Sequence, residues 1–297
     1  MEAVLECRSV DKYFRTQHAI QDFSFTVERG SICGLLGPNG AGKTSLIRMI
    51  LDIFKPDNGE ILLFGSPPGQ GVRDRIGYLP EERGLYRRSK ILDILIYLAA
   101  LKNLPPARSR PYIEEQLEKV GLGGHMHKRT QELSKGMLQK VQIISAIVHQ
   151  PEFLILDEPF SGLDPLNVQV VLQLIEEQRA RGVTLLLSTH QMEIAERLAD
   201  KLVMVHQGQR VLYGTLADIR AEHAEPTLHL TGPTTLPELP EGVTADRLGP
   251  SEWELAFGNR PRNEILSWLM ERGVAVESFS LRVPSLEEIF LRKARGH

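Results

Sequence analysis

Cysteine and long apolar runs are both scarce in this chain. The only two cysteines among its 297 residues, Cys7 and Cys33, lie in apolar, strand-like segments. We therefore expect buried thiols in a reducing compartment and no disulfide framework. The most apolar helical stretch, Ile91–Leu101, is interrupted by Asp93 and is about half of the ~20 residues that a membrane span requires. The sequence predicts no membrane span of its own.

A charge excess of either sign is also lacking. Lys and Arg together number 35 against 38 Asp and Glu, which gives a formal net charge of −3. A nucleic-acid-binding protein usually has a strong basic excess, so no nucleic-acid partner is expected. The N-terminus has no basic start followed by an apolar stretch, so no secretory signal is predicted. We expect a cytoplasmic protein that reaches a membrane only through a partner.

Glycine, by contrast, is concentrated in one informative segment. Residues 37–44 have the form G-x-x-x-x-G-K-[ST] of a phosphate-binding loop, between the apolar run Ile32–Leu36 and a helical stretch. Backbone N–H groups of such a loop cradle phosphates, Lys43 reaches the β- and γ-phosphates, and the Thr44 hydroxyl coordinates Mg²⁺. The predicted nucleotide-binding residues are Gly37, Pro38, Asn39, Gly40, Ala41, Gly42, Lys43, Thr44 and Ser45.

A second signal is an apolar run that ends in two carboxylates. Residues 153–156 are followed by Asp157 and Glu158. We expect this strand to run beside the one that leads into the phosphate loop, which places both acids at the nucleotide. Asp157 is then a Mg²⁺ ligand, directly or through water, and Glu158 a base that accepts a proton from the attacking water.

Three weaker motifs accompany these two. Leu133–Met137 opens a helical stretch with Ser134 as a favourable N-cap, and such a helix start can bind an anion. Residues 161–164 (Ser-Gly-Leu-Asp) follow the acidic pair, and His190 ends the next apolar strand. Each motif alone has an ordinary structural explanation. Their order and spacing together are diagnostic.

In this order the motifs resemble the ATP-binding subunits of ABC transporters over roughly residues 4–222. The resemblance implies an α/β P-loop NTPase core with an antiparallel β subdomain and a helical subdomain at about 86–150. It also implies an ATPase that uses ATP and Mg²⁺. Tyr13 matches the aromatic residue that stacks on adenine, although Phe14 could take that role and Tyr13 could be a core residue.

The resemblance further implies a pair of ATP-binding subunits arranged head to tail, as a homodimer or with a paralogue. Lys43, Glu158 and His190 would be the catalytic residues of each site. The signature residues Ser134, Lys135 and Gly136, and Asp164 of the following loop, would act on the partner's nucleotide. ATP would then hold the closed dimer together.

Two positions depart from the common family pattern. Glu81 stands where most members have glutamine, and a carboxylate there can bind Mg²⁺ but adds negative charge near phosphates. Lys135 makes the signature LSKGM, and its side chain either adds positive charge at the phosphate or projects into solvent. Both variants look like a subgroup of exporters similar to sodium and drug efflux systems.

The pattern also predicts two domains. Residues 1–222 form the nucleotide-binding domain, and residues 223–297 a small α+β accessory domain similar to the appended domain of that subgroup. The leading hypothesis is an ATPase subunit that energises export by a separate integral-membrane permease, located at the inner face of the cell membrane. The alternatives are a soluble ABC ATPase acting on ribosomes or nucleic acid, or a regulatory paralogue.

Overall fold

The computed structural model describes residues 2–15, 17–82, 84, 86–223, 227–258, 260–282 and 284–295. The chain divides into two compact units, Met1–Thr215 and Leu216–His297. The division falls earlier than the expected boundary after residue 222, because helix α8 (Leu216–His223) contacts α10 (Leu286–Arg295) in the second unit. Residues 224–226, just after the expected boundary, lie outside the described residues.

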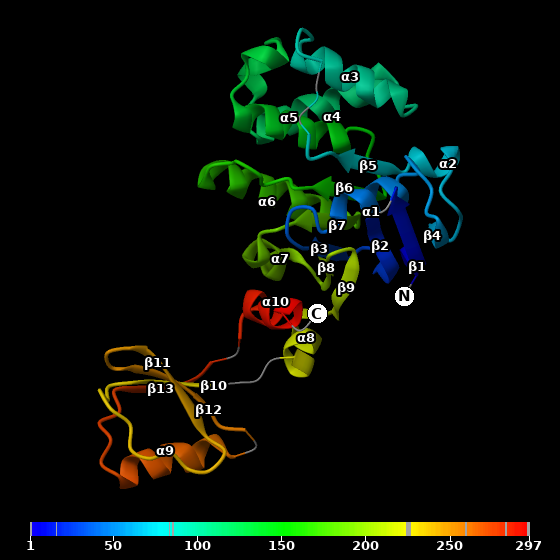
Figure 1. The fold of residues 1–297 in the computed structure, drawn as a ribbon. Coiled ribbons are helices and arrows are strands. Elements are labelled where there is room, and N and C mark those ends of the chain that lie inside the picture. Colours follow the sequence, from blue (N-terminus) through cyan, green and yellow to red (C-terminus); the bar gives the residue numbers. More distant parts are fainter. Residues whose placement is uncertain are drawn as a thin grey trace. The chain divides into compact units, whose positions relative to one another are not determined.

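A six-stranded sheet forms the centre of the first unit (Figure 1). Its order is β5 (Ile76–Leu79), β6 (Phe153–Asp157), β7 (Thr184–Thr189), β3 (Ile32–Leu36), β8 (Lys201–His206) and β9 (Gln209–Gly214). Every neighbouring pair is parallel except β8–β9. All residues of β3, β6 and β7 are buried, which explains their uninterrupted apolar sequences.

The expectation that β6 runs beside β3 is wrong, because β7 lies between them. An apolar run reports burial but not strand order, since each central strand of a parallel sheet has the same kind of sequence. The carboxyl ends of β3, β7 and β6 nevertheless meet at one edge: Leu36 pairs with Thr189, and Asp157 with Ser188. The acidic pair therefore reaches the phosphate loop across one intervening strand.

The predicted accessory sheet is confirmed. It consists of β2 (Gln17–Glu28), β1 (Ala3–Phe14) and β4 (Asn58–Leu63) in that order, all antiparallel. Cys7 on β1 and Cys33 on β3 lie in one hydrophobic core that the two sheets share. Burial raises the pKa of both thiols.

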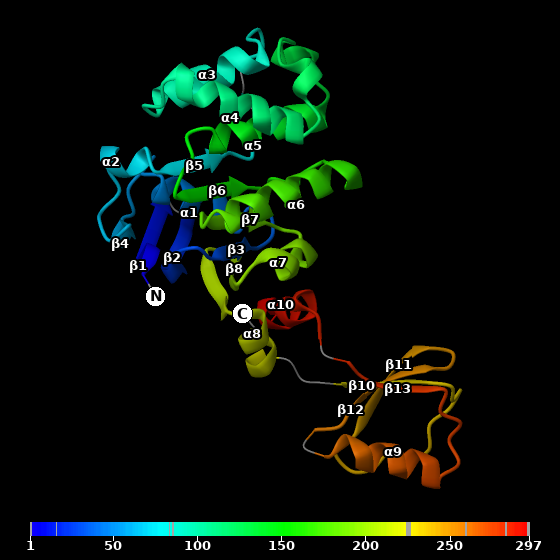
Figure 2. The ribbon, with the colours of Figure 1, turned by 180° about the vertical axis from the view of Figure 1, so that it is seen from behind.

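The predicted helical segment between the strands is also present. Helices α3 (Ile91–Leu101), α4 (Pro106–Lys119) and α5 (Lys135–Ile147) form a bundle that both Figure 1 and Figure 2 show beside the sheet. The other α-helices described in this unit are α1 (Lys43–Ile50), α2 (Gln70–Arg73), α6 (Pro165–Ala180) and α7 (Met192–Leu198). Two short 3-10 helices, η1 (Gly123–His125) and η2 (Thr130–Glu132), lie between α4 and α5. The helical spacing of Leu166, Val170 and Val171 predicts that Leu166 lies on the buried face of α6. It is instead 82% exposed, because it lies in the first turn and the buried face begins at Val171.

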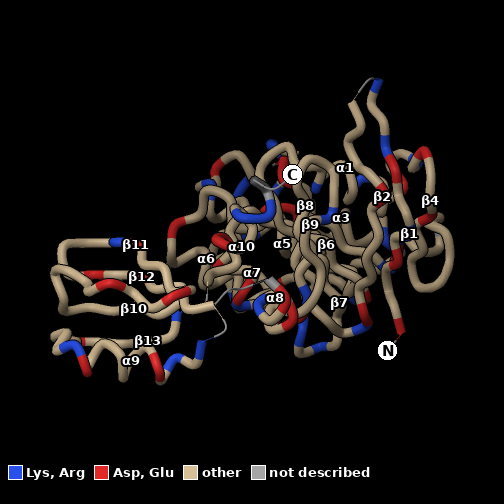
Figure 3. Tube along the Cα trace, turned by 60° about the horizontal axis from the view of Figure 1, so that its bottom comes forward, with Lys and Arg blue, Asp and Glu red and all other residues tan. Residues whose placement is uncertain are grey.

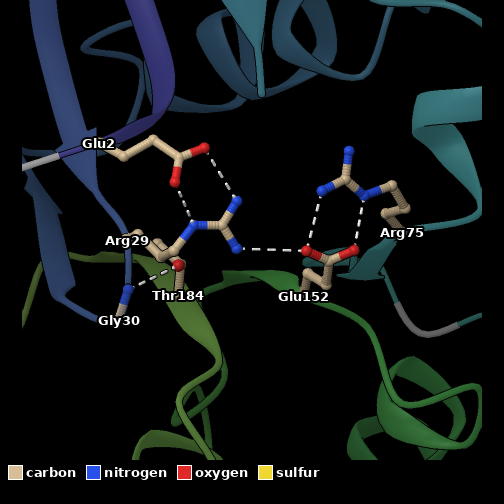
Figure 4. A network of polar contacts seen from close by, with 6 residues as sticks. All are labelled: Glu2, Arg29, Gly30, Arg75, Glu152 and Thr184. Carbon is tan, nitrogen blue, oxygen red and sulfur yellow. Dashed lines mark hydrogen bonds and ion pairs between the residues drawn. The ribbon is translucent and has the colours of Figure 1, made fainter. Parts of the chain in front are cut away.

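A polar network fastens the amino-terminal edge of the central sheet to the accessory sheet (Figure 4). Arg29 donates two hydrogen bonds to Glu2 and one to Glu152, and Arg75 donates two more to Glu152. The Thr184 hydroxyl accepts from the Gly30 backbone. The bidentate Arg75–Glu152 pair is the strongest of these contacts by geometry. Elsewhere, Lys and Arg are interspersed with Asp and Glu along the chain (Figure 3).

The second unit is a small α+β domain. Its antiparallel sheet has the order β11 (Thr244–Gly249), β12 (Glu252–Ala256), β10 (Thr227–Thr231) and β13 (Ser278–Arg282), and α9 (Arg262–Glu271) contributes Ile265 and Leu269 to the core. Sequence reasoning missed β11, whose residues are mostly polar because it is an edge strand. The apolar pattern at 274–283 predicts a strand there; β13 covers its residues 278–282, and residue 283 lies outside the described residues. In neither unit does any described helix have the length and hydropathy to cross a membrane.

Candidate functional site

The loop at residues 37–42 requires glycine at two positions. Gly37 and Gly42 have φ values of 154° and 115°, in the region that side chains with a Cβ rarely adopt. A Cβ on Gly37 would lie 2.3 Å from the Val205 carbonyl oxygen, and one on Gly42 would lie 2.9 Å from the Ala19 carbonyl oxygen. The loop therefore packs directly on the backbone of β8 and β2. Helix α1 begins immediately after it, at Lys43.

A cavity of about 580 Å³ opens over this loop, a size typical of small-molecule sites. Its lining includes predicted residues: Pro38, Asn39, Gly40, Gly42, Lys43, Thr44, Ser45, Glu81 and Glu158. Sequence reasoning missed other lining residues: Gln17, His18, Ala19, Gln21, Gln207 and Gly208. They come from β2 and the β8–β9 turn, which no motif marks. Backbone hydrogen bonds from Gly208 to Ala41 and from Gln21 to Gly208, each 2.9 Å, join that turn to the loop and to β2.

Aromatic side chains stand at one side of this cavity. Phe14 and His18 line it, and the Tyr13 ring stacks on the His18 ring at a centroid distance of 4.0 Å and an interplanar angle of 11°. Tyr13 and Phe14 are 47% and 41% exposed, so neither is a core residue. Exposed aromatic faces of this kind are suited to stacking on a nucleobase.

Lys43 and Glu158 form a buried pair at the phosphate loop. Lys43 Nζ donates a 2.6 Å hydrogen bond to the Gly37 carbonyl and lies 3.3 Å from Glu158 Oε1. The two side chains are only 6% and 4% exposed. Glu158 Oε2 lies 2.9 Å from His190 Nδ1. One carboxylate oxygen thus faces a cation and the other an imidazole, which orients the group as a base requires.

Glu158 is held in this position by its backbone. It follows the last residue of β6 with φ at 49°, and its N–H donates to the Ser188 carbonyl at 2.9 Å. A left-handed conformation is costly for a residue with a side chain and is found where the surroundings enforce it. The strain at Glu158 turns its carboxylate toward Lys43 and His190.

Asp157 places a buried carboxylate beside the Thr44 hydroxyl. The Thr44 hydroxyl donates to Asp157 Oδ2 at 3.1 Å, while Oδ1 is buried and has no hydrogen-bond partner among the described residues. Burial raises the pKa of Asp157, and the nearby charge of Glu81 raises it further. A buried carboxylate oxygen without a partner, beside a hydroxyl, fits a hard cation such as Mg²⁺.

Ser134 of the signature segment and Asp164 are helix N-caps in their own subunit. Ser134 Oγ accepts from the Met137 N–H at 3.2 Å at the start of α5, and Asp164 accepts from Asn167 at the start of α6. Ser134 and Lys135 are exposed, whereas Gly136 is buried. Ser134, Lys135, Gly136 and Asp164 are not among the described residues that line the cavity of the same copy.

Comparisons with known proteins cover both units. Residues 20–161 match the family described as ABC transporter, and residues 214–294 match the C-terminal domain of ATP-binding proteins described as DrrA1-3-like. The uncharacterized ABC transporter ATP-binding protein YhaQ of Bacillus subtilis is 37% identical over 96% of each chain. The Nod factor export ATP-binding protein I of Burkholderia lata is 34% identical over 71% of each chain. A solved ATP-binding subunit of an ABC transporter is 34% identical, with a TM-score of 0.69 over 74% of this chain and 92% of that one.

Proposed function

Because the chain belongs to the ABC transporter ATP-binding proteins, a family that binds and hydrolyses ATP, we propose that it energises export through a separate membrane permease. The observation that carries this proposal is the set of three buried side chains, Lys43, Asp157 and Glu158, with the half-buried Thr44 at the phosphate loop. Similarity to a Nod factor export protein supports the direction of transport. The chain would then act at the inner face of the cell membrane, bound to the permease.

Each residue of the cavity has a defined task in this proposal. Lys43 exchanges its contacts with Gly37 and Glu158 for phosphate oxygens of ATP. Thr44, Asp157 and Glu81 hold Mg²⁺, which when bound neutralises phosphate charge. Glu158 accepts the proton of the attacking water, and His190 orients that water with it. Phe14 or Tyr13 stacks on adenine.

The same proposal includes a second ATP-binding subunit. Ser134 and Lys135 are exposed and lie outside the cavity of their own copy, so they are free to reach the nucleotide of a partner. The capped start of α5 offers a hydroxyl, backbone N–H groups and the positive end of the helix dipole to an anion. Asp164 is also exposed and would contact the opposite subunit.

Mixing two inactive variants tests this arrangement. Lys43→Ala damages the phosphate loop and Ser134→Arg damages the signature, so each homodimer contains two defective sites. A mixed dimer contains one composite site with both elements intact, and we expect ATP-dependent dimerisation to recover partly. Each variant mixed with itself is the control. If the mixture recovers no dimer above those controls, Ser134 does not act across subunits.

A groove next to the nucleotide cavity supports the permease as a partner. It has a volume of about 350 Å³ between α1, α3, β5 and α5, and its lining includes Leu51, Ile53, Arg73, Ile76, Tyr78, Leu98, Leu101, Lys102, Ser145, Ala146 and His149. Ile53 and Leu101 at its edge are 60% and 59% exposed. Tyr78 of this groove and Glu81 of the nucleotide cavity lie on one short segment.

We therefore assign this groove to a cytoplasmic segment of the permease that has an apolar face and an acidic side chain opposite Lys102 and Arg73. Ile53→Asp places a charge in the apolar part and is expected to abolish co-purification with the permease. Leu248→Asp is the matched control, since Leu248 is an exposed leucine in the second unit. Undiminished co-purification of the Ile53→Asp variant would assign the permease to another surface.

A further inference from the structure

Gly136 of the signature segment is buried within its own subunit, although its neighbours Ser134 and Lys135 are exposed. It is the second residue of α5, and its φ is not in the left-handed region, so the backbone conformation does not demand glycine. The space around Gly136, by contrast, does demand glycine. A Cβ on Gly136 would lie 2.6 Å from Asn167 Nδ2 and 3.0 Å from Asn167 Cγ.

The Asn167 side chain that occupies this space is held in place. Its Nδ2 donates a 2.6 Å hydrogen bond to Asp164 Oδ2, and its backbone N–H donates a 2.9 Å bond to Asp164 Oδ1. Both bonds lower the pKa of Asp164, and the backbone bond has the larger effect. This is the direction expected for hydrogen-bond donors to a carboxylate. Asn167 can move away from Gly136 only by breaking a charge-assisted hydrogen bond.

We propose that Asn167 is a positioning residue that locks the Asp164 loop to the signature segment, and that Gly136 is needed to admit it. The inference rests on the proposed function, because both segments are there assigned to the partner's nucleotide. Locked together, they move as one unit toward that nucleotide. A second contact links this unit to the base: Gln139 of α5 donates a 2.9 Å hydrogen bond to the carbonyl of Pro159, the residue after Glu158.

The contact reverses the usual effect of a Gly→Ala substitution. Inside a helix this change normally stabilises a protein, because alanine loses less conformational entropy on folding. At Gly136 the added methyl group must displace the Asn167 amide and break its bond to Asp164. The reversal should vanish when Asn167 is truncated, since the three atoms nearest to the added Cβ all lie beyond the Asn167 Cβ.

Thermal unfolding of the full chain without nucleotide tests the contact. We compare the parent, Gly136→Ala, Asn167→Ala and the double variant, with Gln169→Ala, an exposed residue of the same helix, as the matched control. Gly136→Ala is expected to lower Tm when Asn167 is present and to raise it when residue 167 is alanine. If Gly136→Ala shifts Tm equally with asparagine and with alanine at position 167, the proposed contact is wrong. This result needs no nucleotide and no partner subunit, so it is independent of the proposed function.

Steady-state hydrolysis tests the positioning role. Asn167→Ala removes the side-chain hydrogen bond to Asp164 and keeps the backbone one. It is expected to raise KM for ATP about fivefold, the factor that corresponds to one hydrogen bond, with kcat changed less than about twofold. Gln169→Ala should leave both parameters unchanged. Coupling in the unfolding experiment together with an unchanged KM would show a structural contact only and would overturn the positioning role. Failure of the proposed dimer would appear separately, in the mixing of the Lys43 and Ser134 variants.

Discussion

In the proposed function Lys43 binds the phosphates of ATP, so Glu158 and ATP compete for the Lys43 ammonium group. Without nucleotide, Lys43 Nζ is 3.3 Å from Glu158 Oε1 in a position where both side chains are nearly inaccessible to water. ATP binding must replace this contact and must bring a triphosphate next to a carboxylate. We therefore predict that Glu158→Gln tightens ATP binding while it abolishes most of the turnover.

The geometry gives the size of the effect. Two unit charges at this separation attract by about 5 kcal/mol at an effective dielectric constant of about 20. Desolvation of a buried pair offsets most of that attraction. A net contribution of roughly 1–2 kcal/mol corresponds to ATP binding that is about 5–30-fold tighter. Loss of the proposed general base is expected to lower kcat by about 10²–10⁴-fold.

Equilibrium ATP binding is best measured in a Ser134→Arg background, so that trapping of a closed dimer does not add to the affinity. Glu176→Gln, at an exposed position of α6, is the matched control. An unchanged or weaker affinity of the Glu158→Gln chain would refute the competition for Lys43. Undiminished hydrolysis by Glu158→Gln in the otherwise unaltered chain would remove Glu158 from the role of base.

Two further predictions follow from buried titratable groups. Burial lowers the pKa of His149 to about 4 from 6.5. The folded chain therefore favours the neutral imidazole. Its contribution to the free energy of unfolding is fully present above pH 6.5 and is lost as the pH falls below that value. Between pH 7 and pH 5 this loss is about 2 kcal/mol, and His149→Gln should show a smaller fall in Tm over that range; an equal fall would exclude His149 as a source. Burial raises the pKa of Cys33 to about 12 and also raises that of Cys7, so a thiol reagent should modify neither in the native chain and both in denaturant, whereas rapid native modification would place a thiol at the surface.

The residues that contiguous motifs supply were predictable because their chemistry is local. A glycine loop between a strand and a helix must present N–H groups to an anion, wherever the rest of the chain lies. Ser134 as an N-cap follows equally from local sequence, and the structure confirms it. The roles of Ser134, Glu81 and Asp164 toward a ligand or partner remain predictions.

Other features depended on which segments meet in space. Strand β7 separates β6 from β3, although each of the three reads as the same kind of apolar run. Leu166 is apolar and at helical spacing, yet it lies in an exposed first turn. The β8–β9 turn at Gln207 and Gly208 lines the nucleotide cavity, although no sequence motif marks these residues. Distant contacts of this kind leave no periodic pattern in one sequence.

The amino-acid sequence by itself determined the class of chemistry, because phosphate and metal binding need particular residues at short, regular spacing. Only the tertiary structure decided how those residues are charged and constrained. It pairs Lys43 with Glu158 away from water and leaves Asp157 Oδ1 without a hydrogen-bond partner among the residues that the structure describes. It also sets Asn167 against Gly136. The physical reason is that burial and packing arise between segments far apart in the chain, whereas a motif records only neighbours along it.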